Sequence, residues 1–169
     1  MRRFLMIAVL LGSLAAAFLP LRSEAGAGAY RDTTIPSAPA GRVVKVLPLF
    51  LNLKGHDAIS PSLFDRDAYQ AYLRQHTNEI SAIRFDVLWN ASNLKGAKLK
   101  LRAELRGVDG HAMPRQTVLE TAVTPAFFRS WTSLKLEGDE LKNFGSLVAW
   151  RVTLWNGGQL LGEQKSFLW

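Results

Sequence analysis

Hydrophobic and polar residues alternate along several stretches of the chain. In 83–90 every odd position is apolar and most even positions are polar, and in 97–107 leucine and alanine alternate with charged residues. Because successive side chains of a strand point to opposite faces, each stretch predicts a strand with one buried face. Turn-forming Asn93 and Gly96 lie between the two stretches, so we expect them to form a hairpin.

Five further strands follow from the same pattern in weaker form. They cover 43–53, 117–123, 131–136, 148–155 and 160–169. The segment Asn156-Gly157-Gly158 predicts a tight turn between the last two. Pro48 lies in the first strand, and proline has no N–H to donate to a neighbouring strand. This strand is therefore expected at a sheet edge, or where the chain switches sheets.

One helix is predicted after the first strand, over residues 60–76. Ser60 is a suitable N-cap and Pro61 suits the first turn. Apolar side chains recur close to the helical period and predict one stripe packed on the sheet: Leu63, Phe64, Tyr69, Tyr72 and Leu73. A single helical turn is expected over 139–144, ended by Gly145.

These elements predict a mainly-β, two-layer antiparallel sandwich of about seven strands, with a closed barrel or a jelly roll as alternatives. The alternating strands, the crossover at 139–145 and the final segments W-x-V-x-L-W and G-E-Q-K-S-F-L-W resemble immunoglobulin-like and fibronectin type III-like sandwiches of bacterial exported proteins. The resemblance covers 42–169 and implies the fold and a binding or scaffolding role. The cysteine and tryptophan signature of antibody domains is absent. D-A-Y-Q-A-Y-L-R and G-E-Q-K-S-F-L-W also resemble a small bacterial exported family of unknown function, which implies no activity.

Residues 1–25 have the pattern of a secretory signal peptide. Two arginines precede an uncharged run from Phe4 to Leu19. This run is shorter than the roughly 20 residues that a membrane-spanning helix needs, so cleavage is favoured over retention as an anchor. Small residues permit cleavage after Ala25 and as late as Ala29. We therefore expect the protein in the periplasm or outside a bacterial cell.

Residues 26–41 predict a flexible leader, and 42–169 the sandwich domain. The chain has no cysteine, so an exported domain must be stable without disulfides. The net charge is +7, and cleavage after Ala25 would remove three arginines and one glutamate, leaving 18 basic and 13 acidic side chains. This excess is compatible with acidic partners such as anionic polysaccharide, without selecting one.

No pattern typical of an enzyme, a metal site or a cofactor site is present. Cysteine and G-x-S-x-G are absent, and the three histidines share no spacing. Asp65 and Asp67 lack the further oxygen ligands of a calcium loop. We expect a non-catalytic protein without cofactor. The alternative is a hydrolase with an unrecognised carboxylate pair, for which the candidates are Glu104, Glu120 and Glu163.

Lys98, Lys100 and Arg102 alternate along one predicted strand, which spaces them about 7 Å apart on one face. A polymer of phosphates or uronates could lie along them. The charged outer face of a sandwich produces the same pattern, and Glu104 continues the row with the opposite sign.

The tryptophans divide by their phase along the strands. Trp89 and Trp150 fall in phase with the apolar faces, so they are predicted in the core. Trp155 falls on the opposite face from Val152 and Leu154, so it is the candidate for stacking on a sugar.

The expected function is a protein-binding or scaffolding module in the bacterial envelope. Such domains bind through an open sheet face or an edge strand, here the strand with Pro48 or the C-terminal strand. The alternative is a module for anionic or neutral glycans that uses Lys98, Lys100, Arg102 and Trp155. An envelope protein is the expected partner, nucleic acid is not expected, and membrane contact would require an uncleaved signal.

Overall fold

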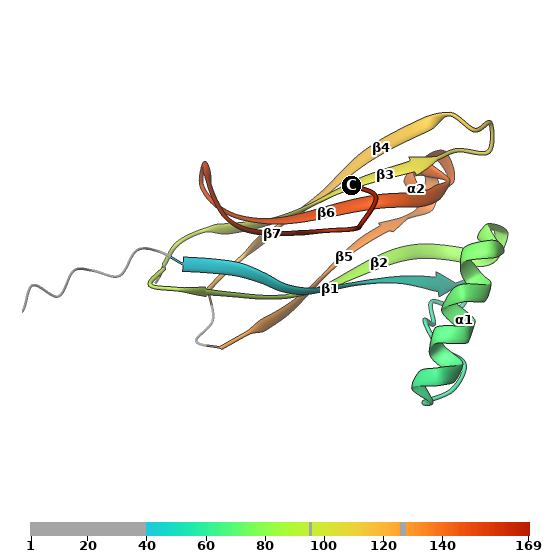
Figure 1. Cartoon of the computed structure of the whole chain (residues 1–169), viewed down its shortest axis with the longest axis horizontal. Coiled ribbons are helices and arrows are strands. Elements are labelled where there is room, and N and C mark those ends of the chain that lie inside the picture. The colour runs from blue at the N-terminus through green and yellow to red at the C-terminus, as the bar shows by residue number, and fades with distance from the viewer. Residues whose placement is uncertain (1–39, 95, 126–127) are drawn as a thin grey trace, which may run out of the picture. The chain divides into compact units, whose positions relative to one another are not determined.

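The computed structural model describes residues 40–94, 96–125 and 128–169 (Figure 1). The predicted signal peptide and all but the last two residues of the predicted leader lie outside these ranges. Within them, no helix is long and apolar enough to cross a membrane.

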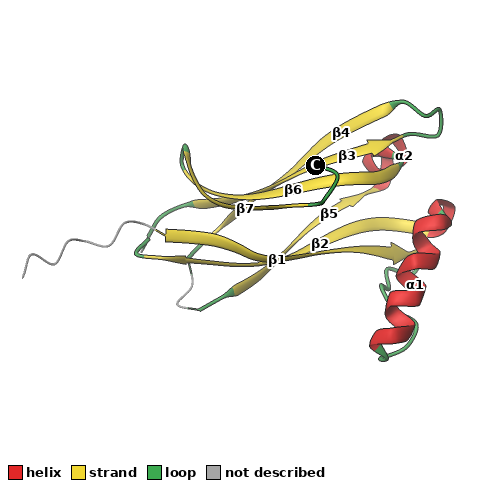
Figure 2. Cartoon of the chain, viewed as in Figure 1, coloured by secondary structure: helices red, strands yellow, loops and turns green. Residues whose placement is uncertain are grey.

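The described chain forms seven strands and two α-helices (Figure 2). In chain order the elements are β1 (Ala40–Asn52), α1 (Leu63–Gln75), a 3-10 helix (Thr77–Glu79), β2 (Ile80–Ser92), β3 (Leu99–Val108), β4 (Pro114–Val123), β5 (Ser130–Glu137), α2 (Gly138–Phe144), β6 (Ser146–Asn156) and β7 (Gln159–Lys165). The strands form two antiparallel sheets, in the orders β1-β2-β5 and β4-β3-β6-β7. The predicted mainly-β sandwich of seven strands, with a helix after the first, is confirmed.

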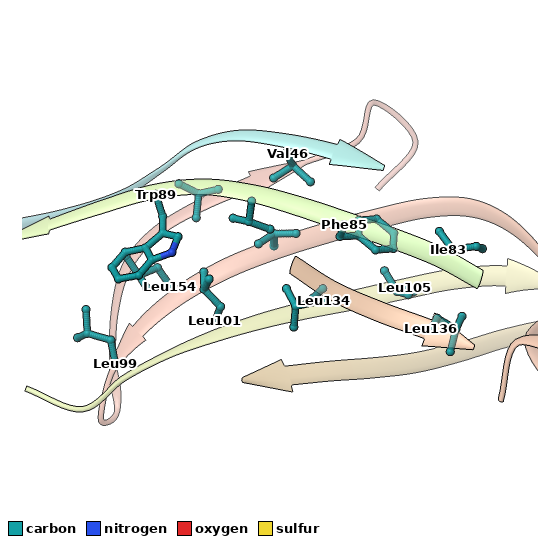
Figure 3. Close-up of a cluster of buried hydrophobic side chains, with 14 of the residues drawn as sticks. Val46, Ile83, Phe85, Trp89, Leu99, Leu101, Leu105, Leu134, Leu136 and Leu154 are labelled. Carbon is teal, nitrogen blue, oxygen red and sulfur yellow. The ribbon is translucent and has the colours of Figure 1, made fainter. Parts of the chain in front are cut away.

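The alternating strands bury their apolar faces against each other in the core (Figure 3). From β2 the core receives Ile83, Phe85, Val87 and Trp89, and from β3 Leu99, Leu101, Ala103 and Leu105, all at most 2% exposed. The core position predicted for Trp89 is confirmed. Trp150 is only partly buried; its ring packs edge-on against Phe85 with the ring centres 6.4 Å apart.

The predicted hairpin between 83–90 and 97–107 is wrong. β2 pairs with β1 and β5, whereas β3 pairs with β4 and β6 in the other sheet. Both strands are interior to their sheets and bury their apolar faces across the core, so the connection between them crosses from one sheet to the other. Alternation in the sequence is the same for two paired strands and for two strands that face each other.

β1 lies at the edge of its sheet, as Pro48 predicts. Its free side is largely occupied by the rest of the protein. Gln164 Nε2 donates to the Val44 carbonyl at 3.0 Å, and Pro48 has no N–H. At Phe50, the Gln70 side chain accepts from the backbone N–H and donates to the carbonyl, both at 2.8 Å.

Helix α1 begins later than predicted. Its N-cap is Ser62, whose Oγ accepts from the Asp65 N–H at 3.4 Å. Ser60 is not the cap; its Oγ accepts from the Ser62 N–H instead. The helix ends at Gln75, close to the predicted end at His76.

The predicted apolar stripe of α1 is wrong in part. Leu63 and Phe64 are 67% and 81% exposed. Leu73 of the predicted stripe is buried as expected. The helix also buries Gln70, whose amide binds the backbone of β1 and the Asp57 carbonyl. The contact between helix and sheet therefore combines apolar packing with a buried polar side chain, and a search for apolar periodicity misses the polar part.

The last strand ends at Lys165, so its predicted extension to residue 169 is wrong. Ser166 turns the chain: Trp150 N–H donates to Ser166 Oγ at 3.0 Å, and Trp169 N–H donates to the Ser166 carbonyl at 3.2 Å. The Trp169 ring then lies 3.9 Å from the Arg106 guanidinium. A cation over a tryptophan face is a favourable contact, which holds the chain end on the outer face of the sheet.

Candidate functional site

Three of the four predicted ligand-binding residues lie together on the outer face of the four-stranded sheet. The register places Lys100 beside Trp155 of β6, and Arg102 between Glu120 of β4 and Thr153 of β6. Lys98 is exposed just before β3 begins.

Carboxylates compensate the charge of this face. Glu120 lies 3.2 Å from Lys100 Nζ and 3.4 Å from an Arg102 nitrogen. Glu104 lies 3.0 Å from Arg102 and 2.6 Å from Arg151 Nε. The more exposed pairs, those of Glu120, contribute little stability, but together the carboxylates turn the predicted cationic row into alternating charges.

Trp155 is not freely exposed on this face. It is half-buried, and its Nε1–H donates to Thr153 Oγ1 at 2.8 Å. The ring's polar atom is thus already bound within the protein, and a sugar would meet only part of the ring.

The carboxylates considered for hydrolysis also belong to this outer face. Glu104 and Glu120 bind the same arginine, Arg102, and Glu163 lies across from Thr153 on β7. None of the three lines the groove described below. Within the described ranges, no three His, Asp or Glu residues are placed to hold a metal ion.

A groove of about 600 Å³ opens between the two sheets, and we call it the β1–β6 groove. In Figure 1, β1 ends and β2 begins beside α1, whereas β3 ends and β6 begins beside α2. Apolar side chains from both sheets line the groove, among them Pro48, Phe50, Ile83, Leu147, Val148 and Trp150. The volume is within the range of ligand pockets in proteins, and half of the lining residues are apolar.

The groove exists because β7 is shorter than β6. The last pair between them joins Arg151 to Lys165, followed only by the contacts of Trp150 with Ser166. β6 continues back to Ser146, and no described strand pairs with Ser146–Ala149 on this side.

A β-bulge modifies the same part of β6. Arg106 pairs with Ala149 and Gly107 with Leu147, so Val148 is an extra residue without a partner on β3. The bulge takes Val148 out of the buried face that Val152 and Leu154 share, although a regular alternation along 148–155 would put it there; Val148 is 46% exposed and lines the groove. Bulges of this kind are common beside functional sites.

Two cations lie at the groove, one from each side. The Arg74 guanidinium of α1 lies 5.6 Å from the centre of the Phe50 ring and has no ion-pair partner among the described residues. Lys142 of α2 contacts Asp139 at 3.0 Å, but these side chains are 77% and 89% exposed. A pair so exposed contributes little, so Lys142 can turn to a ligand.

The acidic side chain at the groove, Asp109, is already bound. It accepts from the backbone N–H groups of Met113 and His111, at 3.0 and 2.8 Å, and contacts Arg115 Nη2 at 2.7 Å. These bonds lower the pKa of Asp109 to about 2. The bond from the Met113 N–H lowers it most, and the bond from Arg115 is the next largest cause. The groove therefore has an excess of positive charge.

The lowered pKa of Asp109 predicts a pH dependence of stability. The folded pKa lies below the ordinary value of 3.8, so ionised Asp109 stabilises the fold above about pH 4, and this contribution is lost as the pH falls toward 2. Wild type and Asp109→Asn should be compared by thermal unfolding between about pH 2 and 7. We expect the difference in Tm to be constant above about pH 5 and to shrink toward pH 2. A difference independent of pH would show that the charge of Asp109 is not what stabilises the loop.

Sequence reasoning missed this groove. The predicted residues Lys98, Lys100, Arg102 and Trp155 do not line it. It depends on where β7 stops and on which strands face each other, and neither is encoded in local periodicity. The sequence offered one signal for the end of β7, which is Ser166. Its side-chain oxygen accepts from the Trp150 N–H of β6, where the strand pairing of β7 with β6 ends.

Comparison with known proteins gives no family for the chain. No family model matches it, and no curated protein matches it in sequence. Among solved structures, a crystal structure of a protein from Akkermansia muciniphila is similar in fold, with 9% identity and a TM-score of 0.48. That match covers 76% of this chain and 70% of the other.

Proposed function

We propose that the protein is an exported, non-catalytic module that binds an extended segment of another envelope protein in the β1–β6 groove. One observation carries the proposal: among the described residues, Ser146–Ala149 of β6 has no strand partner on the side where the groove lies. Export rests on the N-terminal sequence pattern alone.

An extended segment suits this groove because it would continue the line of β7 along β6. The backbone of the partner would bond to the edge of β6, and every second side chain would point into the cavity. Edge strands that remain open are common sites for such strand addition. On the opposite wall, Gln70 already binds Phe50 and Pro48 lacks an N–H, so β1 offers few bonds of its own.

We also propose that the sandwich is of the immunoglobulin or fibronectin type III kind. In that fold the first, second and fifth strands share one sheet, and the third, sixth and seventh share the other. The orders β1-β2-β5 and β4-β3-β6-β7 agree with this, with β4 joined to β3. Binding at a sheet edge is in keeping with the scaffolding roles of such domains.

The outer face of the four-stranded sheet is the weaker candidate for binding. Glu104 and Glu120 compensate Lys100 and Arg102, and the indole N–H of Trp155 is bound to Thr153. These contacts favour a solvated face over a glycan site, which leaves the groove as the better supported surface.

Filling the groove tests the proposal. Random linear peptides displayed on phage are selected on the full chain, and their affinities are then measured on wild type and on Ser146→Trp. Ser146 is exposed and lines the groove, so the indole should occupy the place of the partner and weaken binding at least about tenfold.

Ser133→Trp is the control, because Ser133 is also an exposed serine on a strand and does not line the groove. Ser133 Oγ donates to Asp86 Oδ1 at 2.6 Å, so circular dichroism first confirms that this variant is folded. It should leave the affinities unchanged. If the selected peptides bind Ser146→Trp as tightly as wild type, the groove is not the site and the proposal is wrong.

A further inference from the structure

We infer that the partner segment carries acidic side chains on both sides of one large apolar residue. This inference rests on the proposed function and names the chemistry of the segment. It follows from two separate features of the β1–β6 groove, which are its apolar floor and the cations at its opposite walls.

The floor of the groove is built to receive a large apolar side chain. Phe50 and Ile83 are 6% and 1% exposed, and Trp150 lies beside them, edge-on to Phe85. The space of about 600 Å³ is larger than one side chain needs, so it also admits the backbone of the segment. A buried apolar or aromatic anchor of this kind commonly provides much of the affinity of an interface.

The charges of the groove select the residues beside the anchor. Arg74 comes from α1, which follows β1, and Lys142 from α2, which connects β5 of one sheet to β6 of the other (Figure 1). Asp109, the acidic side chain among the described residues of the lining, is neutralised by Arg115. An extended segment in the groove would therefore pass between two cations that have no strongly bound partner in the part of the chain that the structure describes.

Arg74 is the better placed of the two. Its guanidinium packs over the Phe50 ring, which holds the side chain at the groove without using its N–H donors. A planar guanidinium can bind a carboxylate through two parallel hydrogen bonds, so a pre-positioned Arg74 favours Asp or Glu over a neutral residue.

The test compares peptides that differ only in charge. Peptides selected on the full chain are resynthesised with each Asp or Glu changed to Asn or Gln, and both forms are titrated against wild type, Arg74→Glu, Lys142→Glu and Arg129→Glu. Arg129 is an exposed arginine that does not line the groove, so it is the control. Circular dichroism confirms that each variant is folded.

On wild type and Arg129→Glu, the acidic form should bind about tenfold more tightly than the amide form. Arg74→Glu should abolish or reverse this preference, and Lys142→Glu should reduce it. Equal binding of both forms to wild type, with both lost on Ser146→Trp, would overturn this inference and leave the groove in place. An acidic preference that survives both charge reversals would also overturn it. Binding unaffected by Ser146→Trp would overturn the proposed function itself.

Discussion

Replacing Gly145 by alanine is expected to destabilise the fold by about 3–5 kcal/mol, a large share of the stability of a typical domain. Gly145 ends α2 with φ of 76°, in the left-handed region that side chains disfavour. A Cβ at this position would overlap the backbone oxygen of Val108 and lie 2.7 Å from Asp109 Cα. Backbone cannot move aside as a flexible side chain can, so the start of β6 must shift. Chemical denaturation of wild type and variant measures the difference.

Gly138→Ala separates backbone strain from steric overlap. Gly138 also has a positive φ, of 63°, but a Cβ there would meet nothing within 4 Å. Gly138→Ala should destabilise the fold by only about 1 kcal/mol, because a residue with a Cβ in the left-handed conformation costs roughly that much. Equal losses in the two variants would contradict the close approach of Gly145 to Val108.

Replacing Gln70 by alanine is expected to destabilise the fold by about 2–4 kcal/mol and to loosen α1. The Gln70 amide makes three hydrogen bonds of 2.8 Å, two with the backbone of Phe50 and one with the Asp57 carbonyl. Its removal leaves these backbone groups unpaired beside the core, and a buried unpaired group costs about 1–3 kcal/mol. Chemical denaturation measures the loss, and faster amide exchange at Phe50 locates it.

Gln75→Ala is the matched control for this experiment. Gln75 lies at the end of the same helix but is exposed. A surface substitution of this kind usually changes stability by less than about 0.5 kcal/mol. If Gln70→Ala and Gln75→Ala lower the free energy of unfolding by the same small amount, Gln70 does not connect α1 to β1 as described.

Much of the fold could be predicted because its signals are local. The alternation in β2 and β3 is set by which residues face the core, and the edge position of β1 by the missing N–H of Pro48. These features depend on one strand at a time. The pairing of strands depends on contacts between distant residues, so the hairpin expected between β2 and β3 was wrong.

The candidate site could not be predicted for the same reason. The groove is produced by the length difference between β6 and β7, by the bulge at Val148 and by the separation of the two sheets. In the sequence, Arg74 is one charged residue near the end of a helix. Its importance appears only when the fold places it over Phe50.

Amide hydrogen exchange of the free and peptide-bound protein tests the central claim most directly. If a partner segment adds to β6, those amides of Ser146–Ala149 that point away from β3 should exchange at least about tenfold more slowly at saturation, while those of Ser130–Glu137 in β5 stay unchanged. Unchanged exchange at Ser146–Ala149, with protection on the outer face of the four-stranded sheet instead, would contradict binding in the β1–β6 groove.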